Sequence, residues 1–160
     1  MWKSVQALSL IAGLAPVVVV AAGSDAPPVP VPPLKFEAAL AKIDQKVAKL
    51  FGETKQKTLR QAAEAAVLSD YCAAVNLDQV KFKQEFAALT ADGAKRTPAE
   101  QRNYENKLSM YYGVYVGLLV AEGTDRRAEF CGFAESALKE QKPISRFWIA
   151  TSESARPPKQ

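Results

Sequence analysis

The chain has 160 residues, of which 48% are apolar and 24% charged, and this composition is typical of one globular domain. It contains no histidine, which excludes Ser-His-Asp and Cys-His catalysis and every zinc or haem site with an imidazole ligand. Ten prolines and eight glycines are too few for a low-complexity chain, and two cysteines are too few for a disulfide-dense mini-protein.

The N-terminal 22 residues have the pattern of a secretory signal peptide. Lys3 supplies a positive charge, and the run from Val5 to Ala22 has no ionisable side chain. Small residues end the run, so we expect cleavage after Ala22. The alternative is an uncleaved membrane anchor, because about 20 apolar residues can span a bilayer. Either way, the rest of the chain is expected in an oxidising compartment, periplasmic or secreted.

Residues 23–33 contain five prolines and predict a stiff, extended linker. A polyproline ligand for a partner groove is the alternative interpretation of this segment. The folded domain is then expected over residues 34–149, and residues 150–160 form a predicted flexible tail.

Three helices are predicted in the first half of the domain. The first carries apolar residues at steps of four and three and stops at Gly52. The second is alanine-rich and runs from about Thr54 to Val75, and its small side chains allow a neighbouring helix to approach closely. The third begins after Asp78, a good N-cap, and ends at residues 92–93.

The fourth predicted helix has the strongest local signal, a capping box from Thr97 to Glu100 with Pro98 at the first helical position. We expect it to end at Gly123. It carries two apolar rows, which predict a central helix buried on both sides. The first row is Tyr104, Leu108, Tyr111, Tyr115, Leu118 and Glu122, and the second is Met110, Gly113, Gly117 and Val120.

A fifth helix is expected from Thr124 or Asp125 to the residues before Pro143. No window alternates with period two for long enough to be a sheet strand. The fold class predicted is therefore all-α, a compact bundle of about five helices.

Cys72 and Cys131 fall on the inward faces of the second and fifth predicted helices. As the only two cysteines of a chain expected to be exported, they predict a disulfide with a structural role. A redox-active pair is the alternative, but it needs a local motif such as Cys-x-x-Cys or a cationic setting.

Basic residues are concentrated in the first two helices, with seven basic against three acidic residues from Lys35 to Arg60. They predict either a patch for an anionic lipid, glycan or acidic protein, or an ordinary solvated surface. Nucleic acid is a poorer fit, because aromatic residues are not interleaved with this stretch. The candidate patch comprises Lys42, Lys46, Lys49, Lys55, Lys57 and Arg60.

The segment from Tyr111 to Gly117 contains two glycines four residues apart, each costing about 1 kcal/mol relative to alanine inside a helix. Close crossing of another helix is one explanation. The other is a ligand groove formed by Tyr111, Gly113, Tyr115 and Gly117.

Charged residues cluster at the turn between the fourth and fifth helices. Arg126, Arg127 and Glu129 there suggest either helix caps and surface ion pairs or part of an enzyme site beside the tyrosine and glycine groove. No nucleophile elbow, phosphate loop or metal motif is recognisable, so no catalytic residue, metal or cofactor is predicted.

Phe147 and Trp148 follow the last helix and are expected either to fold back onto the bundle or to anchor a protein partner. The leading hypothesis is an exported binding protein whose partner is a protein or an anionic envelope component, with membrane contact only if the N-terminal segment stays uncleaved. The alternatives are a small helical enzyme or ligand carrier using the groove, and a protective chaperone.

Overall fold

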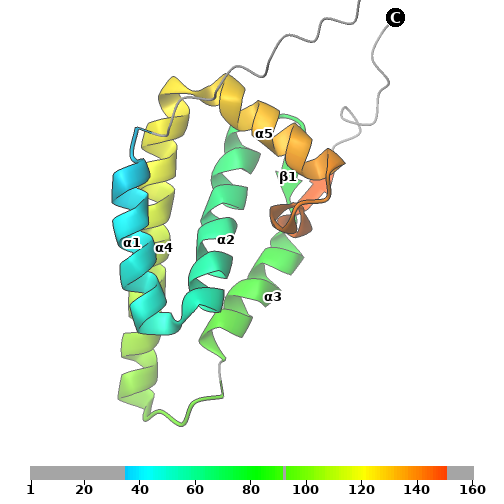
Figure 1. Ribbon diagram of the computed structural model, residues 1–160. Coiled ribbons are helices and arrows are strands. Elements are labelled where there is room, and N and C mark those ends of the chain that lie inside the picture. The colour runs from blue at the N-terminus through cyan, green and yellow to red at the C-terminus, as the bar shows by residue number, and fades with distance from the viewer. Residues whose placement is uncertain (1–34, 92, 151–160) are drawn as a thin grey trace, which may run out of the picture. The chain divides into compact units, whose positions relative to one another are not determined.

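A computed structural model describes residues 35–91 and 93–150, all of which belong to one unit, Pro33–Gln160 (Figure 1). The predicted signal peptide, the linker and all but the first residue of the predicted tail lie outside the described residues. The elements in chain order are α1 (Glu37–Phe51), α2 (Glu53–Tyr71), β1 (Val75–Leu77), α3 (Gln79–Thr90), α4 (Pro98–Asp125), α5 (Arg127–Lys139), the 3-10 helix η1 (Pro143–Phe147) and β2 (Trp148–Ala150).

Three helix boundaries confirm the predicted signals. Gly52 has a φ of 88°, a left-handed conformation that favours glycine, and it alone separates α1 from α2. The Asp78 side chain accepts a hydrogen bond from the Lys81 backbone N–H at 2.9 Å and caps α3. Thr97 and Glu100 form the reciprocal capping box of α4, with each side chain accepting from the backbone N–H of the other.

Gly123 does not end α4, as the sequence pattern had predicted, because the helix continues to Asp125. Gly123 is buried, and a Cβ added to it would lie 2.9 Å from a ring carbon of Tyr71 and 3.0 Å from one of Phe130. The glycine therefore serves close packing inside α4, and the single residue Arg126 then separates α4 from α5.

The absence of strands was a wrong prediction, although the described chain is mostly helical. Cys72 ends α2, and Val75–Leu77 pairs antiparallel with Trp148–Ala150 in a two-stranded sheet. Asp78 extends this connection by donating its backbone N–H to the Phe147 carbonyl at 2.8 Å. Three-residue strands give too short an alternation to be recognised in a sequence, and these two pair only because the chain returns to β1 after α5.

The central helix is α2 and not α4. It contacts each of the other helices, as well as β1 and η1. Three fully buried or nearly buried alanines, Ala62, Ala63 and Ala65, allow this crowding because their side chains keep neighbouring backbones close. Figure 1 shows α1 and α4 side by side on the left, α2 in the middle and α3 on the right. In the same view α5 crosses the upper end of α2.

Two hydrophobic clusters lie on the two sides of α2. One joins α2 to α5, η1 and β1, and its largest members are Phe147 and Trp148. The other joins α1, α2 and α4 and includes Leu40, Leu108 and Tyr115. The two clusters share the partly buried rings of Tyr71, Tyr112 and Phe130.

The predicted disulfide is confirmed. Cys72 at the end of α2 is bonded to Cys131 in α5, with the two Cα atoms 5.2 Å apart. The bridge ties α5 to α2 next to the start of β1. Among the helices of the described residues, none is both long and apolar enough to cross a membrane.

Candidate functional site

The exposed face of α1 carries three lysines on one stripe. Lys42, Lys46 and Lys49 are separated by four and three residues, which places them above one another on a helix, and all three are exposed. Leu40 and Val47 lie on the opposite face and are fully buried. We call Lys42, Lys46 and Lys49 the lysine face.

The one acidic residue in the middle of α1 is turned away from the lysine face. The Asp44 carboxylate accepts a hydrogen bond from the Tyr115 hydroxyl at 2.8 Å and further bonds from the side chains of Gln56 and Arg60. Arg60 also donates through Nε to Glu64 at 2.9 Å. This network joins α1, α2 and α4 on the inner side of α1.

Burial and hydrogen-bond partners shift the pKa values of Arg60, Glu64 and Tyr115 in this network. Burial lowers the pKa of Arg60, but hydrogen bonds and ion pairs to Glu64 and Asp44 outweigh it and leave that pKa above its usual value. Burial raises the pKa of Glu64 despite the attraction of Arg60. Burial, together with the Asp44 carboxylate, also raises the pKa of Tyr115, so its hydroxyl remains a hydrogen-bond donor.

Because Asp44 is satisfied by Arg60, its charge does not offset the lysines. The other two acidic residues of the basic stretch, Glu37 and Glu53, lie in the first turns of α1 and α2. The lysine face therefore has no carboxylate among its neighbours on the same stripe.

The predicted six-residue patch does not act as one surface. Lys57 is exposed like the lysine face. In contrast, Lys55 donates to the Tyr104 hydroxyl at 2.6 Å, and Arg60 is engaged with Asp44 and Glu64. Sequence spacing could not separate these two groups, because the difference depends on partners from α1 and α4.

Phe147 and Trp148 fold back into the bundle, which is one of the two placements that the sequence predicted. Phe147 is fully buried, and Trp148 donates its indole N–H to the Ala65 carbonyl at 3.0 Å. Their burial removes them from the candidate partner surface, because neither ring is presented to solvent.

The tyrosine and glycine groove is not formed. Gly113 and Gly117 are exposed on α4, whereas Tyr115 is fully buried on the opposite side, in contact with Asp44. Residues two apart on a helix point in nearly opposite directions, so these side chains cannot line one groove. A Cβ at either glycine would meet nothing within 4 Å, so the alternative of an intramolecular helix crossing at these glycines is also wrong.

The second apolar row of α4 is therefore not buried. Met110 is 53% and Val120 40% exposed, on the same side as Gly113 and Gly117. This row was expected to lie against a second helix, but its four residues are exposed.

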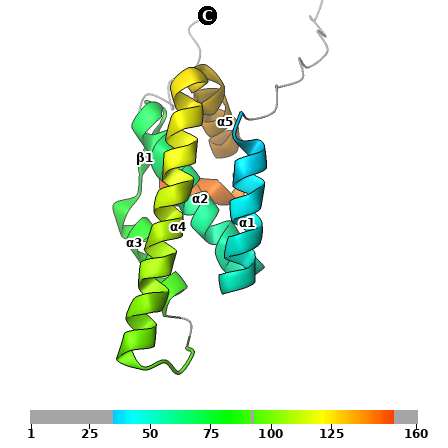
Figure 2. The same cartoon turned by 90° about the vertical axis from the view of Figure 1, so that its left-hand side faces the viewer.

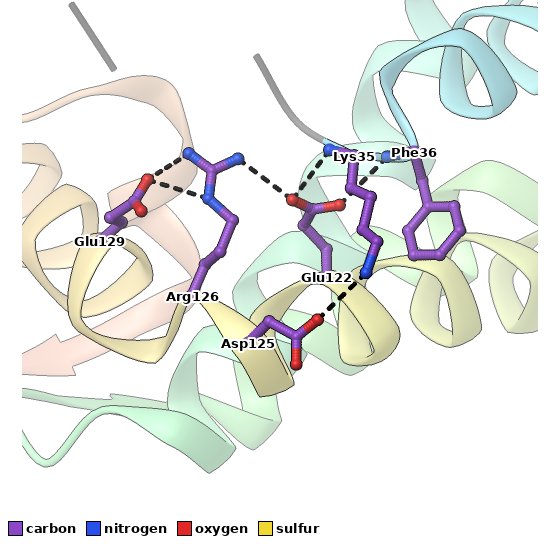
Figure 3. Close-up of polar contacts among 6 residues, drawn as sticks. All are labelled: Lys35, Phe36, Glu122, Asp125, Arg126 and Glu129. Carbon is purple, nitrogen blue, oxygen red and sulfur yellow. Dashed lines mark hydrogen bonds and ion pairs between the residues drawn. The ribbon is translucent and has the colours of Figure 1, made fainter. Parts of the chain in front are cut away.

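A buried carboxylate holds the turn between α4 and α5 (Figure 3). Glu122 is 1% exposed and accepts hydrogen bonds from the backbone N–H groups of Lys35 and Phe36 at 2.9 and 3.1 Å. Arg126 donates to Glu122 at 3.1 Å and also pairs with Glu129. We call Glu122, Arg126 and the two backbone N–H groups the Glu122 clamp.

The clamp replaces a side-chain N-cap for α1, which has none of its own. Burial raises the pKa of Glu122, but the N–H groups of Lys35 and Phe36 and the Arg126 guanidinium outweigh it and keep that pKa below its usual value. The sequence placed Glu122 on the inward stripe but gave no sign of its two backbone partners, which are 86 and 87 residues away.

The arginines at this turn have structural partners and do not converge on one site. Arg127 donates to the Tyr71 carbonyl at 2.9 Å and lies over the Tyr71 ring. Arg126 belongs to the Glu122 clamp. Within residues 35–91 and 93–150, no group of three or more cysteine, aspartate or glutamate side chains is placed to hold a metal ion.

Comparison with protein-family models, with curated proteins and with solved structures finds no match for this chain. The function therefore has to be argued from the surfaces described above.

Proposed function

We propose that the chain is an exported binding protein that contacts an anionic component of the cell envelope through the lysine face. The observation that carries this proposal is the stripe of Lys42, Lys46 and Lys49, whose nearest carboxylate on α1, Asp44, is turned inward and paired with Arg60. The Cys72–Cys131 bridge supports export, because disulfides persist in oxidising compartments.

Phosphate-bearing lipid headgroups are the first candidate for the anionic component. A lysine near an anionic membrane surface contributes about 1 kcal/mol, so three lysines on one face contribute about 3 kcal/mol, or a factor of roughly 100 in binding. Such binding weakens as salt screens the charges. The lysine face offers this contact without any rearrangement of the bundle.

The experiment compares two triple variants of the disulfide-bonded chain by co-sedimentation with phosphatidylglycerol vesicles. Lys42→Gln, Lys46→Gln and Lys49→Gln remove the lysine face, and the expected loss of binding is about 100-fold at low salt. The matched control replaces Lys83, Lys95 and Lys139, three exposed lysines outside α1, by glutamine and has the same net charge. We expect the control to lose much less.

Equal losses in the two variants would contradict a role for the lysine face, because net charge alone would then explain binding. If the wild-type chain sediments with neither phosphatidylglycerol nor phosphatidylcholine vesicles, lipid is not the partner. An acidic protein that co-purifies with the wild type from envelope extracts, and not with the lysine-face variant, would then be the partner.

The small helical enzyme or ligand carrier depended on a groove lined by Tyr111, Gly113, Tyr115 and Gly117 beside Arg126, Arg127 and Glu129. Since these residues lie on different sides of α4 or bind structural partners, no observation favours that alternative.

A further inference from the structure

The outer side of α4 is not covered by any other described element. Figure 2 shows α4 in front, with α1 on one flank and α3 on the other. Met110 and Val120, which are 53% and 40% exposed, lie on this side. We call Met110, Gly113, Gly117 and Val120 the outer α4 face.

The outer α4 face has the properties of a contact surface. No charged residue occurs in α4 between Lys107 and Glu122, so the face is apolar over about four turns. Met110 and Val120 lie about 15 Å apart along the helix axis, with Gly113 and Gly117 between them. Apolar surface that stays exposed marks interaction sites in many proteins. Glycines also weaken a helix, and these two serve no packing among the described residues, since a Cβ at either would contact nothing there within 4 Å.

We propose that the outer α4 face binds a second copy of this chain, with the two α4 helices antiparallel about a two-fold axis at the level of Tyr115. The face is symmetric about that level, so the axis places Met110 against the partner's Val120 and Gly113 against the partner's Gly117. A two-fold interface requires this self-complementarity. The paired glycines let the two backbones approach closely, while methionine and valine fill the space on either side.

Charges flanking the face favour the antiparallel arrangement. Lys107 and Asp125 lie about five turns apart, and therefore on the same flank of α4. A two-fold axis at Tyr115 brings Lys107 level with the partner's Gly123, so the partner's Asp125 lies on the same flank about 3 Å farther along the helix, within reach of a lysine side chain. Both residues are exposed, and the ion pair of Asp125 with Lys35 at 3.3 Å is exposed as well. A parallel dimer would instead place Lys107 and the partner's Lys107 at the same level on opposite flanks and would lack this pairing.

Sedimentation velocity over a range of protein concentrations tests this proposal on the disulfide-bonded chain without any partner present. We expect a reversible monomer–dimer equilibrium for the wild type. Val120→Lys buries two charges in the interface and should weaken the dimer by at least about tenfold. Val80→Lys is the matched control, because Val80 is 67% exposed on α3, outside the outer α4 face. It should leave the equilibrium unchanged.

A charge exchange tests the register. Lys107→Asp and Asp125→Lys each place like charges across the interface and should weaken the dimer about three- to tenfold, and the double variant should restore it. A wild type that stays monomeric, or equal effects of Val120→Lys and Val80→Lys, would overturn the proposal. A dimer without recovery in the double variant would overturn the antiparallel register. Since lysine-face binding is measured separately, either proposal can fail alone.

Discussion

Three glycines of α4 show how differently one residue type is used along a single helix. Gly123 is buried against the rings of Tyr71 and Phe130, whereas Gly113 and Gly117 face solvent. An added methyl group therefore meets a filled space at the first position and open space at the other two. The same substitution should have opposite effects on stability.

We expect Gly123→Ala to lower the free energy of unfolding by about 1–3 kcal/mol, because the Tyr71 ring must move to admit the Cβ. Gly113→Ala and Gly117→Ala should each raise it by up to about 1 kcal/mol, since alanine is the better helix former. Urea denaturation at a concentration where the chain is monomeric measures all three. A stabilising Gly123→Ala would contradict the packing described here.

At the scale of the elements, the Glu122 clamp connects the start of α1 to the turn between α4 and α5. The contact joins a carboxylate to backbone N–H groups of Lys35 and Phe36, so it does not depend on the side chains at those two positions. When a buried carboxylate is protonated, it becomes a weaker hydrogen-bond acceptor, and the N–H groups that donate to it lose part of their stabilisation. The clamp should therefore make the position of α1 sensitive to acid.

Glu122→Gln should lower the free energy of unfolding by about 1–3 kcal/mol at pH 7. The pKa of Glu122 lies below its ordinary value of 4.5, so the stability that the carboxylate contributes is present above about pH 4.5 and is lost as the pH falls through the pKa of the folded state. The difference between wild type and variant should therefore shrink on acidification. Urea denaturation at a series of pH values measures it.

The exposed Glu135→Gln substitution on α5 is the control for Glu122→Gln. We expect a change within about 0.5 kcal/mol for it. If the difference in the free energy of unfolding between wild type and Glu122→Gln stays constant down to the lowest pH measured, the charge of Glu122 does not stabilise the clamp.

At the scale of the whole molecule, the disulfide is a covalent link between the first half of the folded unit and its last α-helix. It joins α2 to α5 across 59 residues, next to the cluster that contains Phe147 and Trp148. Cross-linking a loop of this length lowers the entropy of the unfolded chain enough to stabilise the folded state by about 4 kcal/mol. That is comparable to the total stability of many small domains.

Replacing Cys72 and Cys131 by alanine should lower the free energy of unfolding by about 4 kcal/mol. Wild-type protein treated with a reductant should unfold at the same urea concentration as the double variant, and the reductant should not change the variant itself. If reduction leaves the wild-type midpoint in place, the bridge is not a stabilising link.

Local signals predicted much of this architecture. Gly52, Asp78 and the Thr97–Glu100 capping box set helix ends through contacts within a few residues, so they can be read without knowing the fold. The inward positions of Cys72 and Cys131 follow from helical periodicity, and their pairing follows from their number.

The candidate site was predicted only in part. The spacing of Lys42, Lys46 and Lys49 placed them on one face, but the inward turn of Asp44 depends on Gln56, Arg60 and Tyr115 from two other helices. The prediction of a groove was wrong because residues two apart on α4 point to opposite sides of the helix.

The sequence by itself determined that the described chain is mostly helical, where α1 ends, where α3 and α4 begin, and which cysteines pair, because these depend on short-range periodicity, capping and composition. Only the tertiary structure decided that α2 is central, that Glu122 caps α1 and that one apolar side of α4 faces solvent. Those outcomes depend on which helices become neighbours, and the spacing of residues within a helix does not specify its neighbours.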